Sequence, residues 1–254
     1  MTTDTFDPSE VAVVTGAARG IGFGIALHLG RQGLTVALLD RDAAALDAAV
    51  GALVAEGVKA LGAVADLTDS AAVNAAFAHV NARAGRVDHL VNNAGAVRDM
   101  RFLTMRDEDW DLVIDTNLKS QFLCCRAALP GMLERGHGRI VNISSRAWLG
   151  GFGQANYSAA KGGVVSLTRS LAIEFASKGV TVNAVAPGIV DTPLFRDFTP
   201  EVQARLKASV PVKRIGTADD IANAVAFFLH PAASYVTGQT LYVCGGRSLS
   251  SPSV

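Results

Sequence analysis

The sequence contains little that would favour binding to nucleic acid, metal or membranes. Its 254 residues include 23 basic and 23 acidic side chains, and Lys and Arg are scattered rather than clustered. No basic field therefore favours nucleic acid or an anionic surface. The three cysteines, Cys124, Cys125 and Cys244, match neither a metal-ligand spacing nor a disulfide framework. We expect Cys124 and Cys125 to be small buried hydrophobic residues, and we expect no metal.

A targeting segment is also missing from the pattern. The first basic residue is Arg19, so the amino terminus lacks the positive region of a signal peptide. The longest uncharged run, Ile221–Gly246, contains His230, Pro231 and several Ser, Thr and Gln residues. A membrane helix needs about 20 predominantly apolar residues, and this run does not supply them. The sequence predicts a cytoplasmic protein without a membrane partner.

What the sequence does contain is an alternation of short apolar runs and longer helical patterns. The short runs, rich in β-branched residues and mostly without polar alternation, predict strands at Val11–Val14, Thr35–Leu39, Lys59–Val64, His89–Val91, Arg139–Ile143, Thr181–Ala186 and Thr240–Val243. Between them, helices are predicted at Ile21–Gln32, Ala43–Glu56, Ser70–Ala84, Trp110–Arg135, Tyr157–Lys178 and Ala218–Leu229. This alternation predicts an α/β fold: a single Rossmann-type domain over residues 1–254, with a doubly wound parallel sheet and helices on both faces.

Two segments fall outside the alternation. Residues 1–8 are predicted to be a flexible tail. Residues 188–213 are the longest interruption and contain Pro193, Pro200 and Pro211. Long excursions inside compact domains are commonly functional, so this segment is predicted to be a substrate lid.

Three glycines follow the first predicted strand and open the first predicted helix. Gly16 allows a tight turn, Gly20 permits close approach of a ligand to the backbone, and Gly22 lets the helix pack on the sheet. The amino terminus of that helix then presents free N–H groups and a positive dipole to a pyrophosphate. The strand–turn–helix context predicts a dinucleotide site.

Asp40 ends the second predicted strand, where a carboxylate can accept hydrogen bonds from both hydroxyls of an adenosine ribose. It would also repel a 2′-phosphate, so NAD is the predicted cofactor and NADP is less favoured. Arg19 and Arg41 are the residues that could reach such a phosphate. The alternative is that Asp40 only caps the following helix.

Tyr157 and Lys161 are four residues apart at the start of a predicted helix, so their side chains project from one face. A free phenol has a pKa near 10, which is too high for ready proton exchange at neutral pH. A neighbouring ammonium favours the phenolate and lowers that pKa. The pair is therefore a candidate for acid/base chemistry.

Further polar motifs, Asn92-Asn-Ala-Gly95, Ser144-Ser145 and Pro187-Gly188, end predicted strands, and Asn117 lies in the predicted helix Trp110–Arg135. Together with Thr15-Gly-x-x-x-Gly-x-Gly22 and Tyr157-x-x-x-Lys161, this combination resembles the one-domain branch of the short-chain dehydrogenase/reductase family, about 250 residues long, over nearly the whole chain. One departure is Cys244, which stands where the family carries an acidic residue of structural importance.

The resemblance implies four catalytic roles. Tyr157 would be the general acid/base on the substrate oxygen, and Ser144 would hydrogen-bond that oxygen. Lys161 would bind the nicotinamide ribose and depress the pKa of Tyr157, while Asn117 would hold a water that links Lys161 to solvent. A developing alkoxide needs such a positioned proton donor.

The resemblance also implies a cofactor-binding set. Asp66 would contact the adenine amino group, although it could instead cap the helix that begins near Ser70. Asn93 and Gly95 would form the wall behind the adenosine ribose. The full predicted set is Gly16, Arg19, Gly20, Ile21, Gly22, Asp40, Asp66, Leu67, Asn93, Ala94, Gly95, Tyr157, Lys161, Pro187, Gly188, Ile189 and Thr192, the last two holding the nicotinamide carboxamide.

The predicted function is an NAD(P)-dependent oxidoreductase that transfers a hydride between a nicotinamide and a secondary alcohol or ketone. A 3-oxoacyl thioester reductase or a 3-hydroxyacyl-CoA dehydrogenase is the alternative, and the sequence leaves both open. A dinucleotide sensor is disfavoured because the proton-transfer residues are present. A nucleotide-sugar epimerase needs a larger substrate domain. A structural subunit of an active partner remains a third possibility.

The sequence also offers candidate residues for a substrate pocket and for assembly. Arg146, two residues beyond Ser144, could pair with a substrate carboxylate or phosphate, or form a structural salt bridge. Apolar walls could come from Trp148, Phe152, Leu194, Phe195 and Phe198. By resemblance, the helices Trp110–Arg135 and Tyr157–Lys178 would pack against a second subunit in a homodimer or homotetramer.

Overall fold

Seven strands form one sheet in the computed structural model, which describes residues 6–249. Every neighbouring pair is parallel, in the order β3-β2-β1-β4-β5-β6-β7. The strands are β1 (Val11–Thr15), β2 (Thr35–Asp40), β3 (Ala60–Val64), β4 (His89–Asn92), β5 (Gly138–Ile143), β6 (Val180–Pro187) and β7 (Thr240–Val243). All seven predicted strands and the predicted parallel sheet are confirmed.

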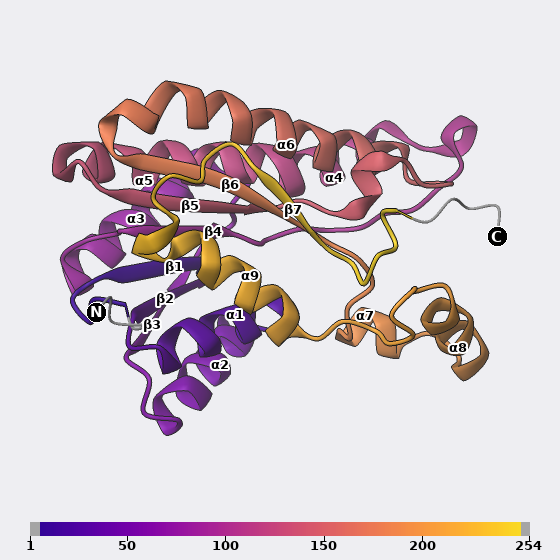
Figure 1. Cartoon of the computed structure of the whole chain (residues 1–254), viewed down its shortest axis with the longest axis horizontal. Helices are drawn as coiled ribbons and strands as arrows, with labels where there is room; N and C mark the ends of the chain where they lie inside the picture. The colour runs from indigo at the N-terminus through magenta and orange to yellow at the C-terminus, as the bar shows by residue number, and fades with distance from the viewer. Residues whose placement is uncertain (1–5, 250–254) are drawn as a thin grey trace.

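The helices cover both faces of the sheet, as Figure 1 shows. They are α1 (Gly20–Arg31), α2 (Ala43–Ala55), α3 (Ser70–Ala84), α4 (Asp107–Ile114), α5 (Ser120–Arg135), α6 (Ala155–Phe175), α7 (Pro193–Arg196), α8 (Pro200–Ala208) and α9 (Ala218–Leu229). One core layer packs Ala12 and Val14 of β1 against α1, α2 and α9, whereas Val11 and Val13 face α3 and α5. Burial on both faces explains why these strands lack polar alternation.

The order of the strands reverses between β1 and β4. The chain winds outward from β1 through β2 to β3, returns to β4 beside β1, and continues to β7. Neighbouring crossovers leave this point in opposite directions, which opens a crevice at the carboxyl ends of β1 and β4. Ligands of doubly wound sheets bind in such a crevice.

The prediction of one continuous helix over Trp110–Arg135 is wrong. A π-helical turn, Asp115–Lys119, separates α4 from α5 and holds the predicted site residue Asn117. A π turn inserts one extra residue into the hydrogen-bonded ladder, so it re-aims the side chains that follow. Hydrophobic periodicity alone does not detect a one-residue insertion.

The predicted tail also ends earlier than expected. Residues 1–5 lie outside the described part of the chain, but Phe6 is buried. Its ring packs edge-on against His89 and His230, with centroids 5.7 and 5.8 Å away. These aromatic contacts hold the chain against the sheet before β1 begins.

The segment after β6 forms two short helices, α7 and α8, which project beyond the sheet in Figure 1.

Cys124 and Cys125 are buried, as predicted, and burial raises the pKa of Cys125 to about 12. None of the helices in the described residues is long and apolar enough to span a membrane. Within residues 6–249, no cluster of three or more His, Cys, Asp or Glu residues is arranged as a metal site.

Candidate active site

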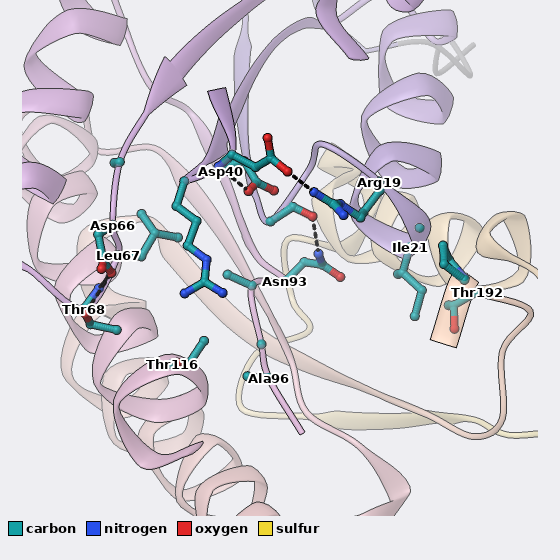
Figure 2. Close-up of a pocket in the computed structure, with 18 residues that line it drawn as sticks. Arg19, Ile21, Asp40, Asp66, Leu67, Thr68, Asn93, Ala96, Thr116 and Thr192 are labelled. Atoms are coloured by element: carbon teal, nitrogen blue, oxygen red, sulfur yellow. Dashed lines mark hydrogen bonds and ion pairs between the residues drawn. The ribbon is translucent and has the colours of Figure 1, made fainter. Parts of the chain in front are cut away.

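A cavity of about 630 Å³ opens at the carboxyl ends of the strands around the switch point (Figure 2). Ten predicted cofactor residues line it: Gly16, Arg19, Gly20, Ile21, Asp40, Asp66, Leu67, Asn93, Ala94 and Gly95, with Thr192 as an eleventh. In Figure 2, Asp66 and Leu67 lie on one side of the cavity and Ile21 and Thr192 on the other. The cavity is thus elongated between β3 and the start of α7.

Glycine is required at two positions of the turn after β1 because of what surrounds them. A Cβ on Gly16 would lie 2.8 Å from the Cα of Ala94, and Gly16 has a positive φ of 61°. A Cβ on Gly22 would lie 2.3 Å from the carbonyl oxygen of Gly16. Gly22 does not line the cavity; it lets α1 approach the turn. Above Gly20 a Cβ would meet nothing closer than 3.9 Å, which leaves space next to the backbone.

The first turn of α1 faces the cavity without a protein cap. Its N-cap residue, Arg19, makes no side-chain hydrogen bond to the helix, and the first turn contains no acidic side chain. The free N–H groups of this turn therefore remain available for an anion. The geometry matches a pyrophosphate cradle.

Asp40 does not cap α2, so that alternative is wrong. Asp42 is the cap and accepts a hydrogen bond from the amide of Ala45 at 3.1 Å. The Asp40 carboxylate instead accepts from the amides of Ala18 and Asp42, each at 3.2 Å. These bonds fix the carboxylate at the cavity wall, while Arg19 forms an ion pair with Asp42.

Asp66 likewise does not cap α3, because Asp69 does, accepting from the amide of Ala71 at 2.9 Å. The Asp66 carboxylate accepts from the amide and the hydroxyl of Thr68, at 2.9 and 2.7 Å. These two bonds lower the pKa of Asp66 below its usual value. Asp66 is therefore a fixed acceptor at the far end of the cavity.

Asn93 shapes the cavity through the backbone of the glycine turn. Its side-chain amide donates to the carbonyls of Thr15 and Gly16 at 3.0 and 3.1 Å; Figure 2 draws the bond from Asn93 to the glycine turn. The hydroxyl of Thr15 in turn accepts from the amides of Asn93 and Ala94. The ends of β1 and β4 are thereby locked together across the crevice.

Six predicted cofactor residues do not line the main cavity: Gly22, Tyr157, Lys161, Pro187, Gly188 and Ile189. Pro187 ends β6, and Gly188 packs so closely on Cys244 that a Cβ would lie 2.7 Å from the Cα of Cys244. Ile189 lines a second, small cavity beside Cys244. The sequence analysis missed several lining residues that lie one or two positions from predicted ones: Asp42, Ala65, Thr68, Ala96, Thr116 and Pro193. Arg41, considered only for a 2′-phosphate, also lines the cavity.

Tyr157 and Lys161 share one face of α6, as the four-residue spacing predicts. The Lys161 ammonium nitrogen lies 5.6 Å from the centroid of the Tyr157 ring and donates to the carbonyl of Ile143 at 2.8 Å. Burial lowers the pKa of Lys161 to about 7 and raises the pKa of Tyr157. The expected depression of the Tyr157 pKa by Lys161 is not met here, since burial of the phenol dominates.

Asn117 lies beside this pair because of the π turn. Its side-chain N–H groups donate to the carbonyls of Ala96 and Val113 at 2.7 and 2.9 Å. Its buried Oδ1 has no hydrogen-bond partner among residues 6–249. A Cβ on Gly95 would lie 2.6 Å from that oxygen and 3.6 Å from the Lys161 nitrogen, so glycine keeps the space between them open. A water there would satisfy the buried acceptor.

The two serines after β5 have different partners. The hydroxyl of Ser144 is buried and donates to the backbone carbonyl of Lys161 at 2.8 Å. The hydroxyl of Ser145 instead accepts from the amide of Ala147 at 3.1 Å and counteracts part of the rise that burial causes in the pKa of Tyr157. The hydroxyl of Ser144, which the resemblance assigns to the substrate oxygen, is thus engaged by α6.

The predicted substrate residues do not form one wall. Phe152 is 90% exposed, and Trp148 stacks on Tyr242 with centroids 6.4 Å apart. Phe195 and Phe198 pack edge-on at 6.4 Å, and the side chain of Leu194 lies outside the described residues. Arg146 is half-buried, and its Nε donates to the carbonyl of Arg247 at 3.2 Å.

Comparison with known proteins gives matches over nearly the whole chain. A family model described as enoyl-(acyl carrier protein) reductase matches residues 16–248. The (2S)-[(R)-hydroxy(phenyl)methyl]succinyl-CoA dehydrogenase subunit BbsD of Thauera aromatica is 47% identical over 95% of this chain and 97% of its own. The 3-oxoacyl-[acyl-carrier-protein] reductase FabG of Escherichia coli is 42% identical, over 93% and 96%. A crystal structure of an actinorhodin polyketide ketoreductase variant with NADPH superposes with a TM-score of 0.92 at 41% identity, covering 96% of this chain and 99% of that one.

Proposed function

The chain belongs to the short-chain dehydrogenase/reductase family, whose members are NAD(P)-dependent oxidoreductases, and from this premise we propose that it interconverts 3-hydroxyacyl and 3-oxoacyl thioesters. The observation that carries the proposal is the pair of Tyr157 and Lys161 on one face of α6, next to a cavity of about 630 Å³: a Cβ on Gly95, which lines that cavity, would lie 3.6 Å from the Lys161 nitrogen. Both relatives named above act on acyl thioesters by their names. A simple secondary alcohol or ketone is the second candidate, since the chemistry at the reacting carbon is the same.

The residues present fit a nicotinamide dinucleotide. The uncapped start of α1 and the open space above Gly20 suit the pyrophosphate, and Asp66 would meet the adenine. Asp40 would accept hydrogen bonds from the adenosine ribose. We propose NAD over NADP because the Asp40 carboxylate is fixed at the cavity wall and Arg19 is paired with Asp42 rather than free for a 2′-phosphate. Arg41 is the remaining cation that lines the cavity.

When bound, the nicotinamide supplies or accepts the hydride at the substrate carbon. In reduction, Tyr157 would donate its phenolic proton to the carbonyl oxygen as the carbon–oxygen double bond becomes a single bond; in oxidation it would take the hydroxyl proton back. Ser145 would donate a second hydrogen bond to the same oxygen. In this proposal Ser145 takes the role that the resemblance implied for Ser144.

Lys161 and Asn117 would renew the proton on Tyr157. Lys161, with a pKa of about 7, can exchange a proton near neutral pH. The unpartnered Oδ1 of Asn117 would accept a hydrogen bond from a water next to Lys161, so that protons reach solvent. Asn117 acts through this water and does not touch the substrate.

Two structural proposals accompany the activity. We propose that α7 and α8 close over the substrate as a lid, because Pro193 of α7 already lines the cavity. We also propose a homo-oligomer, formed through the exposed Trp110, Phe122 and Ile173 on α4, α5 and α6. A monomeric mass in light scattering at micromolar concentration would contradict the oligomer.

The activity is tested by a panel of 3-oxoacyl thioesters and simple ketones with NADH, together with the corresponding alcohols with NAD, monitored by NADH absorbance. We expect the thioesters to give the higher kcat/KM. A matched panel with NADPH separates cofactor choice from substrate choice. Turnover of none of these substrates would contradict the proposed function.

A further inference from the structure

A fully buried asparagine stands directly before the proposed acid/base. Asn156 has no exposed surface, lies in the first turn of α6 and is followed by Tyr157. An amide side chain buried in this way destabilises the fold unless its N–H groups and its oxygen are hydrogen-bonded. The partners of Asn156 therefore show what the residue does.

The oxygen of Asn156 holds the backbone amide of Tyr157. The first amides of a helix have no partner within the helix, and Gln154, the N-cap residue of α6, makes no side-chain cap bond. The Oδ1 of Asn156 accepts from the amide of Tyr157 at 2.8 Å. This bond fixes the backbone from which the phenol extends.

The nitrogen of Asn156 reaches two other segments. Its Nδ2 donates to the carbonyl of Arg98 and to the carbonyl of Asp109, each at 3.1 Å. Arg98 belongs to the segment after β4, and Asp109 belongs to α4, which packs against α6 (Figure 1). One side chain thus joins three parts of the chain.

Further contacts hold the same parts together. The Asp109 carboxylate is buried and lies 3.8 Å from the Nε of Arg98. The amide of Met100 donates to the carbonyl of Gly153, just before α6, at 2.8 Å. Asn156 has no exposed surface, so water cannot replace the bonds that it adds to this connection.

The segment that Asn156 holds is continuous with the wall of the cofactor cavity. Gly95 and Ala96, which shortly precede Arg98, line that cavity, and Asn117 donates to the carbonyl of Ala96 at 2.7 Å. The phenol must reach the substrate oxygen while the nicotinamide reaches the substrate carbon. Reacting groups need to be held to within about 0.5 Å for this, by hydrogen bonds from the residues around them.

We propose, on the basis of the proposed function, that Asn156 is a positioning residue: it sets the phenol of Tyr157 relative to the cofactor cavity by joining the first turn of α6 to the segment after β4. Asn156 contacts neither substrate nor cofactor and exchanges no proton. Its loss should therefore slow the chemical step and leave cofactor binding nearly unchanged.

Two variants separate the two ends of the Asn156 side chain. Asn156→Ala removes all three bonds, whereas Asn156→Asp keeps an acceptor for the amide of Tyr157 and removes both donors. We expect each variant to lower kcat about ten- to a hundredfold, the cost of a misplacement of about 1 Å, and to change KM for the nicotinamide cofactor by less than about threefold. Asn156→Asp carries the test if Asn156→Ala fails to fold.

A near-parental kcat in Asn156→Asp would show that only the bond to the helix amide matters and would overturn the proposal. A near-parental kcat in Asn156→Ala would overturn it as well.

Asn183 is the matched control, because it is also fully buried and also joins two segments. Its Nδ2 donates to the carbonyl of Val236 at 2.8 Å, and its Oδ1 accepts from the amide of Gln239 at 3.0 Å. Asn183→Ala should lower the urea concentration at the midpoint of unfolding, as Asn156→Ala should, but leave kcat nearly unchanged. An equal fall of kcat in both variants would assign the loss to general destabilisation and overturn the positioning role.

A double-variant cycle tests whether Asn156 acts through Tyr157. In a Tyr157→Phe background, Asn156→Ala should not lower the residual turnover further, because the group that Asn156 positions is already gone. Losses that multiply would overturn the proposal.

Hydrogen exchange separates this proposal from the proposed function, because it needs no turnover. We expect the peptide that contains Met100 to exchange its amides faster in both Asn156 variants than in the parent protein, and at the parent's rate in Asn183→Ala. The parent's rate in both Asn156 variants would overturn the proposal. The expected exchange in a protein that turns over none of the tested substrates would contradict only the proposed function.

Discussion

The hydroxyls of Ser144 and Ser145, neighbours in sequence, serve different partners: Ser144 donates to the carbonyl of Lys161, whereas Ser145 accepts from the amide of Ala147 and counteracts part of the rise in the pKa of Tyr157. The bond of Ser144 ties the end of β5 to α6, whereas Ser145 acts on the phenol. The two serines are therefore expected to fail in different ways when substituted.

Ser145→Ala should lower kcat by about 10²–10³, the cost of removing one hydrogen-bond donor from a developing oxyanion, in addition to the loss of its hydrogen bond from the amide of Ala147. Ser144→Ala should instead cost about 1 kcal/mol of unfolding free energy and change kcat by only a small factor. Steady-state kinetics and urea unfolding of both variants measure these effects. A large kcat loss in Ser144→Ala with unchanged Ser145→Ala kinetics would reverse the assignment.

Asp40→Ala should narrow the preference for NADH over NADPH, because it removes the carboxylate that repels a 2′-phosphate. We expect the ratio of kcat/KM with NADH to kcat/KM with NADPH to fall about tenfold or more, and a tenfold change corresponds to about 1.4 kcal/mol. Arg41→Ala is the companion variant: it should weaken NADPH more than NADH. A wild-type enzyme that prefers NADPH would show that Arg41 outweighs Asp40.

Tyr157→Phe should lower turnover by orders of magnitude and leave NADH binding, measured by fluorescence titration, nearly intact, because the lost hydroxyl contacts the substrate. A variant with near-normal turnover would exclude Tyr157 as the acid/base.

The pH dependence follows from the raised pKa of Tyr157. Oxidation requires the deprotonated phenol, which is a minor species below that pKa, so kcat/KM for oxidation should rise with pH, by up to about tenfold per unit. Reduction uses the protonated phenol and should not rise over the same range. Lys161→Met should remove any inflection near its pKa of about 7. A wild-type oxidation rate that is independent of pH would contradict this scheme.

A buried acid at the opposite edge of the sheet predicts how stability depends on pH. Glu10 lies 2.9 Å from the imidazoles of both His89 and His137. Burial alone would raise the pKa of Glu10, but hydrogen bonds from His137 and His89 outweigh it and hold the pKa well below its usual value. Burial, only partly offset by Glu10, lowers the pKa of His89.

The lowered pKa values of His89 and Glu10 both reduce stability as the pH falls. Below about pH 6.5 the unfolded chain binds a proton at His89 that the folded protein refuses, and below about pH 4.5 the same holds for Glu10. The stability contributed by these two groups is therefore fully present above about pH 6.5, and the free energy of unfolding falls in two stages on acidification. The urea concentration at the midpoint of unfolding, measured across this pH range, tests the prediction. Glu10→Gln should lower the free energy of unfolding at neutral pH by about 1–3 kcal/mol and should remove the loss of stability below about pH 4.5. A midpoint that rises on acidification would contradict it.

The strands and the glycine turn could be predicted from the sequence because their causes are local. A strand buried on both faces must be apolar throughout, and a turn as crowded as that at Gly16 excludes every side chain but hydrogen. The spacing of Tyr157 and Lys161 is equally local, since the geometry of one helical turn places them on one face. The candidate cofactor site was accordingly predicted in outline, with eleven of its residues on the cavity wall.

The tertiary structure decided what depends on irregular segments. Side chains alternate between the two faces at the end of a strand, so the path of the loop after β5 decides whether Ser144 or Ser145 faces Tyr157, and a family motif does not reveal that path. The π turn at Asn117 and the bond from Lys161 to Ile143 arise where α4, α5 and α6 pack together. The meeting of Arg146 with Arg247 likewise exists only because parallel strands far apart in sequence end at the same edge of the sheet.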